Sequence, residues 1–77
     1  MNKKIFLQHI DNLLELSSGT TKEEDELAKI VSWDSLAVLG FIAFVDQNFG
    51  TVLSPVDIYN AQTIKDLMSL LGSKITN

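Results

Sequence analysis

Apolar residues recur every three or four positions between Lys3 and Leu16, so they fall on one face of a helix. The pattern predicts a first helix over residues 3–16. Asn2 is in place to cap its start, and Ser17-Ser18-Gly19 supplies a stop, because glycine adopts the left-handed conformation without strain. His9 lies beside the apolar face and is expected at its rim. The face itself consists of Ile5, Phe6, Ile10, Leu13, Leu14 and Leu16.

The most apolar run of the chain begins at Leu36 and predicts a second helix from Ser35 to Phe49, ended by Gly50. Its expected core side consists of Val38, Phe41, Ile42, Val45 and Phe49. The other side consists of Ala37, Gly40, Phe44 and Gln47. A large apolar side chain such as Phe44 is unexpected on the side of a helix that faces away from the core. Either Phe44 packs on a neighbouring helix, or it belongs to a contact surface.

Between these helices, residues 20–34 begin polar and acidic and then regain apolar side chains. We interpret this segment as a long loop. Its second half, with about one helical turn, is expected to be held to the core by Leu27 and Ile30. The acidic run 23–26 is either a solvated face or part of a docking field for a partner.

Two shorter elements are predicted after the second helix. Ser54-Pro55 is a typical helix start, because the hydroxyl caps and proline has no N–H to leave unpaired; it predicts a short helix through Tyr59. Thr63 with Asp66 resembles a capping box and predicts a last helix over 64–71, closed by Gly72. Residues 73–77 are expected to be a mobile tail.

These elements predict one all-α domain over residues 1–77. The expected architecture is a bundle of three main helices plus one short helix, with a long loop between helices one and two. No alternating pattern predicts a strand.

Composition narrows the chemistry that this domain can perform. There is no cysteine and only one histidine, so thiolate nucleophiles, disulfides and clustered Cys/His metal sites are not expected. The chain has no arginine and a net charge of −4, which removes the electrostatic attraction that nucleic-acid binding depends on. The apolar run 36–45 is too short to span a bilayer. We therefore expect a soluble, cytoplasmic domain that binds no nucleic acid and does not insert into a membrane.

Ser35, at the start of the apolar run, is the candidate for chemistry. A catalytic serine needs a base and an oxyanion hole, but the only histidine is His9 and no Gly-x-Ser-x-Gly motif surrounds Ser35. We therefore do not expect an enzyme. Asp34 and Ser35 are both good helix-start residues, so the residues alone leave open that Ser35 is only a helix cap.

The order of elements, with Asp34-Ser35-Leu36 opening the second helix after a long loop, resembles the acyl carrier protein family. The resemblance covers essentially the whole chain. It rests on Trp33-Asp34-Ser35-Leu36, on the apolar pattern that ends at Phe49-Gly50, and on Thr63-Ile64 at the start of the last helix. It implies that a separate phosphopantetheinyl transferase attaches 4′-phosphopantetheine from coenzyme A to Ser35, and that acyl groups are carried as thioesters on this arm.

The resemblance also implies roles for neighbouring residues. Asp34 and Leu36 would frame the arm, and Trp33 would either contact the transferase or anchor the loop on the core. Further candidate contacts, for acyl-loading and acyl-processing enzymes, are Phe44, Asp46 and Gln47. A monomer is expected. An acyl chain would lie between helices, in a space lined by Leu39, Ile42, Ala43, Ile58, Ala61 and Ile64.

One feature departs from the common family pattern. Carriers of fatty-acid biosynthesis usually have a strongly acidic second helix, whereas here that helix contains only Asp46. We therefore expect a specialised carrier in lipid, polyketide or other secondary metabolism, whose docking depends more on apolar contact than on salt-sensitive charge. Two alternatives stay open. One is a peptidyl or aryl carrier of a non-ribosomal peptide pathway, and the other is a helical interaction module in which Ser35 is only a cap.

Overall fold

Four α-helices form the protein in its computed structural model, which describes residues 1–77. They are α1 (Lys3–Leu13), α2 (Ser35–Phe49), α3 (Pro55–Tyr59) and α4 (Ile64–Ser69). Two 3₁₀ turns, η1 (Leu27–Lys29) and η2 (Gly72–Lys74), complete the secondary structure, and there is no strand. The predicted all-α class is confirmed, and α2 and α3 have the predicted bounds. No helix combines the length and the apolar character needed to span a bilayer.

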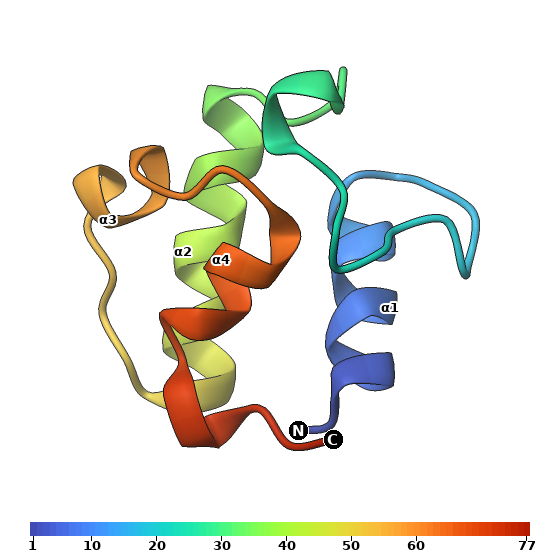
Figure 1. The fold of residues 1–77 in the computed structure, drawn as a ribbon. Coiled ribbons are helices and arrows are strands. Elements are labelled where there is room, and N and C mark those ends of the chain that lie inside the picture. The colour runs from blue at the N-terminus through green and yellow to red at the C-terminus, as the bar shows by residue number, and fades with distance from the viewer.

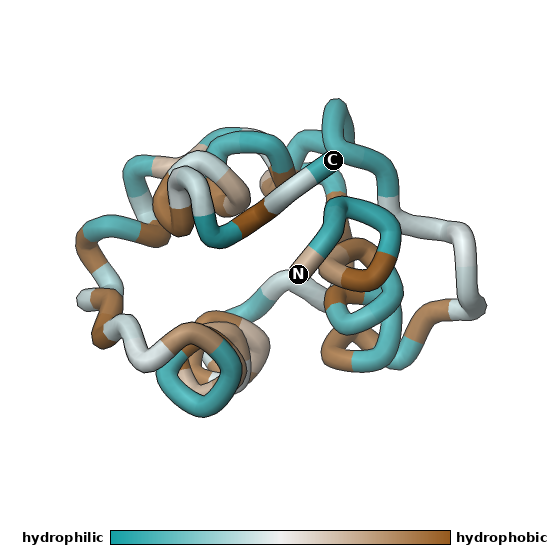
Figure 2. The backbone as a smooth tube through the Cα atoms, turned by 90° about the horizontal axis from the view of Figure 1, so that it is seen from below, coloured by the Kyte–Doolittle hydropathy of each residue, from teal (hydrophilic) through white to brown (hydrophobic).

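The helices enclose a single core. α1 and α2 run antiparallel, α4 lies in front of α2, and α3 lies beside the first turns of α2 (Figure 1). Figure 2 views the bundle nearly along the axes of α1 and α2, and hydrophobic and hydrophilic residues alternate around their turns. The most deeply buried apolar side chains come from all four helices and are Phe6, Ile10, Phe41, Val45, Ile58, Ile64 and Leu67.

α2 is packed on two sides, which the sequence did not predict. Its expected core side is confirmed, because Phe41 and Val45 are fully buried. The other side lies against α1. There the ring centroid of Phe44 is 6.0 Å from that of Phe6 and 5.0 Å from that of His9. Phe44 therefore packs on α1, as one of the two hypotheses had it, and because its ring is only half-buried its contact with a partner stays a prediction. His9, predicted at the rim, is half-buried there.

α1 ends at Leu13, three residues before the predicted end at Leu16. The Glu15 N–H donates to the Asn12 carbonyl (3.2 Å) and the Leu16 N–H donates to the Asp11 carbonyl (2.8 Å). This pair of bonds is a Schellman motif, and its left-handed position is occupied by Glu15 (φ +59°), where glycine is usual. Gly19, the expected stop, is also left-handed but lies four residues further on.

The buried carboxylate of Asp11 ties the following loop to α1. Its oxygens accept hydrogen bonds from the Gly19 N–H (2.9 Å), the Thr21 N–H (2.8 Å) and the Thr21 hydroxyl (2.6 Å). Burial raises the pKa of Asp11, but the bonds from Thr21 and Gly19 together lower it more, so the net pKa lies below its usual value. These hydrogen bonds require the chain to turn back toward Asp11, which accounts for the early end of α1.

The long loop is attached to the N-terminus of α4. The Leu27 N–H donates to the Gln62 carbonyl (2.9 Å), and the Lys65 N–H donates to the Glu23 carbonyl (2.8 Å). The predicted helical turn is η1, and Leu27 is buried as expected. Two residues of the acidic run form ion pairs within the chain. Glu23 pairs with Lys3 (3.4 Å), and Glu26 pairs with Lys29 (2.8 Å).

The C-terminal residues are not a free tail. α4 ends at Ser69, two residues before the predicted end, and η2 follows Leu71. The Thr76 N–H donates to the Met1 carbonyl (2.8 Å), and the Thr76 carbonyl accepts from the Lys3 N–H (2.9 Å). The last residues therefore pair with the first ones, and the mobility expected for residues 73–77 stays a prediction.

Candidate functional site

The first turn of α2 is capped by Asp34. Its Oδ1 accepts a hydrogen bond from the Ala37 N–H (2.9 Å), and its carbonyl accepts from the Val38 N–H (3.0 Å). Asp34 is therefore the N-cap, and Ser35 is the first residue inside the helix. The hypothesis that Ser35 serves as the helix cap is wrong, because the residue before it does so.

The Ser35 hydroxyl is exposed and takes part in none of the side-chain hydrogen bonds of the chain. The hydroxyl residues at the starts of α3 and α4 differ in this respect. Ser54 and Thr63 stand at the N-cap of α3 and α4, and each forms a capping box with the acidic residue three positions later. Ser35 alone among these three hydroxyl groups has no structural role in its helix start.

Two backbone N–H groups at this helix start have no acceptor within the helix and are free to bind one from outside it. Those of Ser35 and Leu36 precede the first intrahelical hydrogen bond, and the Asp34 side chain uses only the Ala37 N–H. With 15 residues, α2 is the longest helix of the chain, and its dipole places partial positive charge at this end. A phosphoryl group on Ser35 would therefore meet free N–H donors.

Apolar side chains surround Ser35 on its solvent side. Leu36 is 77% exposed and Leu39 is 60% exposed, although both stand in the most apolar helix of the chain. On the adjacent α3, Val56 and Tyr59 are also exposed. Because the α2 surface near Ser35 has no acidic residue beyond the cap, any partner that approaches this face meets chiefly apolar contacts.

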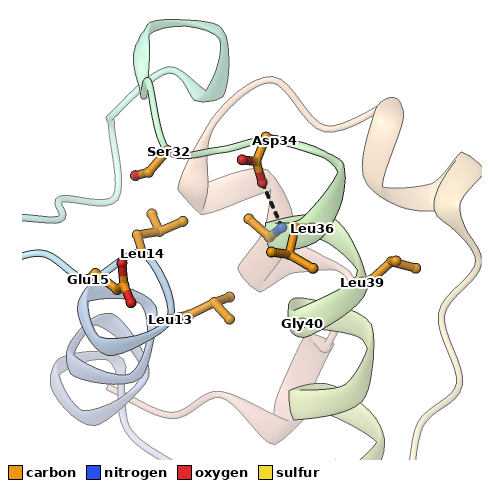
Figure 3. Close-up of a pocket in the computed structure, with 9 residues that line it drawn as sticks. Leu13, Leu14, Glu15, Ser32, Asp34, Leu36, Leu39 and Gly40 are labelled. Atoms are coloured by element: carbon orange, nitrogen blue, oxygen red, sulfur yellow. Dashed lines mark hydrogen bonds between the residues drawn. The ribbon is translucent and has the colours of Figure 1, made fainter.

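An open groove of about 500 Å³ lies between the C-terminal end of α1 and the first turns of α2. Figure 3 shows Leu13, Leu14 and Glu15 on the α1 side and Leu36 on the α2 side, with Ser32 and Asp34 above them. Leu39 lies at the rim, with its side chain directed away from α1 (Figure 3). Ala37 and Gly40 complete the lining.

Gly40 lets the two helices approach each other below this groove. A Cβ atom added at Gly40 would lie 2.7 Å from Cδ1 of Leu13, which is too close for an ordinary contact. Glycine costs roughly 0.5–1 kcal/mol relative to alanine within a helix. A glycine in the middle of α2 is therefore explained by close packing against α1.

The other residues predicted for the site are spread over α2 and the loop. Trp33 is half-buried, with its ring centroid 6.1 Å from that of Phe41, so it anchors the loop on the core as one of the two hypotheses had it. Asp46 and Gln47 are exposed, but they stand roughly 16 Å or more along the helix axis from Ser35, at about 1.5 Å per residue. Their contact with partners stays a prediction.

The predicted acyl space does not exist as a cavity. Ile58 and Ile64 are closed within the core, whereas Leu39 and Ala43 face outward. The groove near Ser35 lies instead on the α1 side of α2, and its residues Leu13, Glu15, Ser32 and Gly40 were not predicted for the site. Only the isolated glycine in an apolar helix carried a signal, since such a glycine often has a packing reason.

Comparison of the chain with protein-family models, with curated protein sequences and with solved structures finds no match. No group of three or more His, Cys, Asp or Glu side chains is placed to hold a metal ion. The interpretation of the site therefore depends on its own geometry and on the sequence motif around Ser35.

Proposed function

We propose that this chain is an acyl carrier protein and that Ser35 carries a 4′-phosphopantetheine arm. The observation that carries the proposal is the exposed Ser35 hydroxyl, which makes no hydrogen bond while Asp34 caps the helix. A serine whose exposed hydroxyl has no hydrogen-bond partner in the fold is free to be modified. The order of helices and the Asp34-Ser35-Leu36 motif resemble those of the same family.

The modification is a phosphoryl transfer from coenzyme A. The Ser35 oxygen attacks the β-phosphorus, an O–P bond forms, and the pyrophosphate linkage breaks to release adenosine 3′,5′-bisphosphate. A base on the transferase takes the hydroxyl proton, because no basic side chain of this chain lies beside Ser35. The free N–H groups of Ser35 and Leu36 suit the phosphodiester that results.

The residues at the site fit this group. Once attached, the arm supplies a thiol that holds an acyl group as a thioester. The chain contributes exposure, a helix start and an absence of competing thiols, since it contains no cysteine. In this proposal the four helices form an acyl-carrier-like bundle, and the protein is a monomer without enzymatic activity of its own.

The proposed partners are a phosphopantetheinyl transferase and enzymes that load or process the acyl group. Exposed Leu36 and Leu39 on α2, with Val56 and Tyr59 on α3, favour partners that offer an apolar docking face. The scarcity of acid on α2 supports a specialised carrier rather than one of bulk fatty-acid synthesis. Affinity for such a partner should fall little as salt rises, and a steep fall would contradict this part of the proposal.

The test of the arm is an intact-mass measurement. The folded protein is incubated with coenzyme A and a broad-range phosphopantetheinyl transferase, and we expect one phosphopantetheine per chain. Ser35→Ala should receive none. Ser54→Ala is the matched control, because Ser54 is also an exposed serine at a helix start, and it should be modified as the wild type is.

Two outcomes would overturn the proposal. One is the absence of any mass increase on wild-type protein whose helical circular dichroism shows that it is folded. The other is an increase that persists in Ser35→Ala. If the arm is added, charging of the holo protein by an adenylating enzyme for amino or aryl acids, and not by an acyl-loading enzyme, would indicate a peptidyl or aryl carrier.

A further inference from the structure

We propose that the groove between the end of α1 and the start of α2 receives an arginine side chain of a protein partner. The occupant is the guanidinium group with its methylene stem, on a segment that has apolar residues on either side of the arginine. The inference does not depend on an arm at Ser35. It adds one charged contact to the apolar surface that Leu36 and Leu39 expose.

The lining of the groove is mainly apolar. Leu13 and Leu14 line it on the α1 side and Leu36 on the α2 side (Figure 3). Leu36 is 77% exposed, so the groove leaves apolar surface in water that a partner can cover. At about 500 Å³ the groove has room for a long side chain. Arginine suits it, because the methylene stem packs on apolar walls while the charged end keeps contact with water.

The polar side chains of the groove are unpaired and mainly hydrogen-bond acceptors. The Glu15 carboxylate and the Ser32 hydroxyl make no hydrogen bond or ion pair within the chain. Asp34 uses only one of its carboxylate oxygens, on the Ala37 N–H. Neither a lysine nor the histidine lines the groove, so its two negative charges have no cation beside them. The groove is therefore complementary to a positively charged donor.

The nature of this cation follows from the acceptors. A divalent metal ion needs more oxygen ligands than two carboxylates supply, and no group of three or more His, Cys, Asp or Glu side chains is placed to hold one. The acceptors come from the end of α1, from the loop and from the start of α2. A guanidinium group has five N–H donors and is weakly hydrated, whereas a lysine ammonium is compact and strongly hydrated. Arginine therefore fits this arrangement better than lysine.

The charge of the groove depends on a residue in an unfavourable backbone conformation. Glu15 has φ of +59°, at a position where glycine is usual. Its carboxylate has no partner in the fold that would offset the strain. Glycine there would leave Asp34 as the only carboxylate of the groove. The acidity of the groove is thus not a by-product of the stability of the fold.

A cation in this groove is compatible with docking that depends little on salt. Leu13 and Leu36 would remove the charge partly from water, and partly buried pairs are screened less than exposed ones. The open side of the groove leaves the guanidinium in contact with water, which limits the cost of desolvation. The contact therefore fixes the orientation of a partner more than it raises the overall affinity.

Nuclear magnetic resonance of the unmodified protein tests the groove. The probe is the peptide acetyl-Leu-Arg-Leu-amide, and the control peptide has citrulline, which is uncharged and of the same shape, in place of arginine. We expect the arginine peptide to shift the backbone amides of Leu13, Glu15 and Leu36. The amides of Met68 and Ile75, in the second cavity, should stay unchanged. The citrulline peptide should bind about tenfold more weakly, because it lacks the charge-assisted hydrogen bonds.

Glu15→Gln and Asp34→Asn identify the residues that pair with the guanidinium. Each removes one charge and nearly keeps the shape of the side chain, and asparagine still caps a helix well. Each should weaken binding of the arginine peptide roughly threefold and leave the citrulline peptide unaffected. Glu24→Gln removes an equal charge at an exposed position outside the groove and should have no effect at physiological salt. Circular dichroism checks that each variant is folded.

Three outcomes would overturn the proposal. The first is that millimolar arginine peptide leaves the amides of Leu13, Glu15 and Leu36 unshifted. The second is equal binding of the citrulline peptide, which would mean that the groove takes an uncharged apolar segment. The third is equal binding of a peptide with lysine in place of arginine, which would remove the preference for guanidinium. None of these outcomes bears on the arm, because the intact-mass test of Ser35 is made separately.

Discussion

The two ends of the contact between α1 and α2 differ in how the space between the helices is filled. At one end, Phe6 and Phe44 lie in a cluster of rings that also includes Phe41, with Phe6 and Phe41 edge-on at 6.2 Å. At the other end, Leu13, the last residue of α1, meets Gly40, and an open groove lies between this end of α1 and the first turns of α2. The first end is part of the core, and the second lies beside Ser35.

The difference shows that one end of the α1–α2 contact stabilises the fold, whereas the other end stays open to solvent. Aromatic rings join α1 to α2 at the closed end, so the open end need not be filled in order to hold the helices together. Exposed apolar side chains and a strained Glu15 are then tolerated at the groove. The following predictions test this separation, from the largest expected effect to the smallest.

Phe6→Ala should remove the aromatic packing between α1 and α2 at the closed end. Phe6 is fully buried, so its loss should lower the free energy of unfolding by about 3–5 kcal/mol, through lost burial and the cavity left behind. Leu36→Ala, at the open end, should change it by less than about 0.5 kcal/mol, because Leu36 is exposed. Urea unfolding followed by circular dichroism measures both. Equal losses would contradict the separation of the two ends.

Asp11→Asn should loosen the loop that continues from the open end. The buried carboxylate holds Gly19 and Thr21, so the change should cost roughly 1–3 kcal/mol. The pKa of Asp11 is lowered in the folded protein, so its contribution is complete above the usual carboxyl pKa. It is lost as the pH falls below about 4 and through the lower folded-state pKa. Urea titrations at several pH values should show a larger acid-side loss in the wild type than in Asp11→Asn, where the lowered pKa of Asp66 still contributes, and Asp46→Asn is the exposed control.

Thr63→Ala and Ser35→Ala compare two hydroxyl residues at helix starts. Thr63 caps α4 and accepts from the Asp66 N–H, so its loss should cost about 1 kcal/mol. The Ser35 hydroxyl makes no hydrogen bond, so its loss should change stability by less than about 0.5 kcal/mol. Thermal unfolding of both variants checks this. A clear destabilisation by Ser35→Ala would mean that this hydroxyl has a structural role.

Glu15→Gly should slightly stabilise the open end. Glycine relieves the left-handed strain, about 1 kcal/mol, while its greater freedom in the unfolded chain offsets part of the gain. The net rise should be roughly 0.5 kcal/mol in the free energy of unfolding. Glu24→Gly, at a solvent-exposed loop position without positive φ, is the control and should not stabilise. Destabilisation by Glu15→Gly would show that the Glu15 side chain supports the fold.

Features that depend on adjacent residues were predictable from the sequence. The bounds of α2 follow from its apolar run and Gly50, the start of α3 follows from Ser54-Pro55, and the capping box at Thr63 follows from Asp66. The choice of Ser35 as the candidate residue also came from local sequence. The sequence did not show that the Ser35 hydroxyl is unbonded, because Asp34 and Ser35 are equally suited to cap the helix. Only the structure distinguishes the two residues.

Features that depend on distant partners were not predictable in this way. The early end of α1 depends on hydrogen bonds from Gly19 and Thr21 to Asp11, eight and ten residues apart. The position of Phe44 depends on α1 lying against a side of α2 for which the periodicity of α2 alone left a neighbouring helix and a contact surface both open. The groove is lined by residues from the end of α1, from the loop and from the start of α2, so no single stretch of sequence contains it.

The pairing of the first and last residues has a practical consequence for protein engineering. Met1 and Thr76 are hydrogen-bonded, and both termini lie at the end of the bundle opposite the start of α2 (Figure 1). A short linker could join them, and new ends could be opened near the exposed Val52 to give a circular permutant. A purification tag, a fluorophore or a surface anchor attached at Met1 or Asn77 would extend away from the groove and leave it accessible.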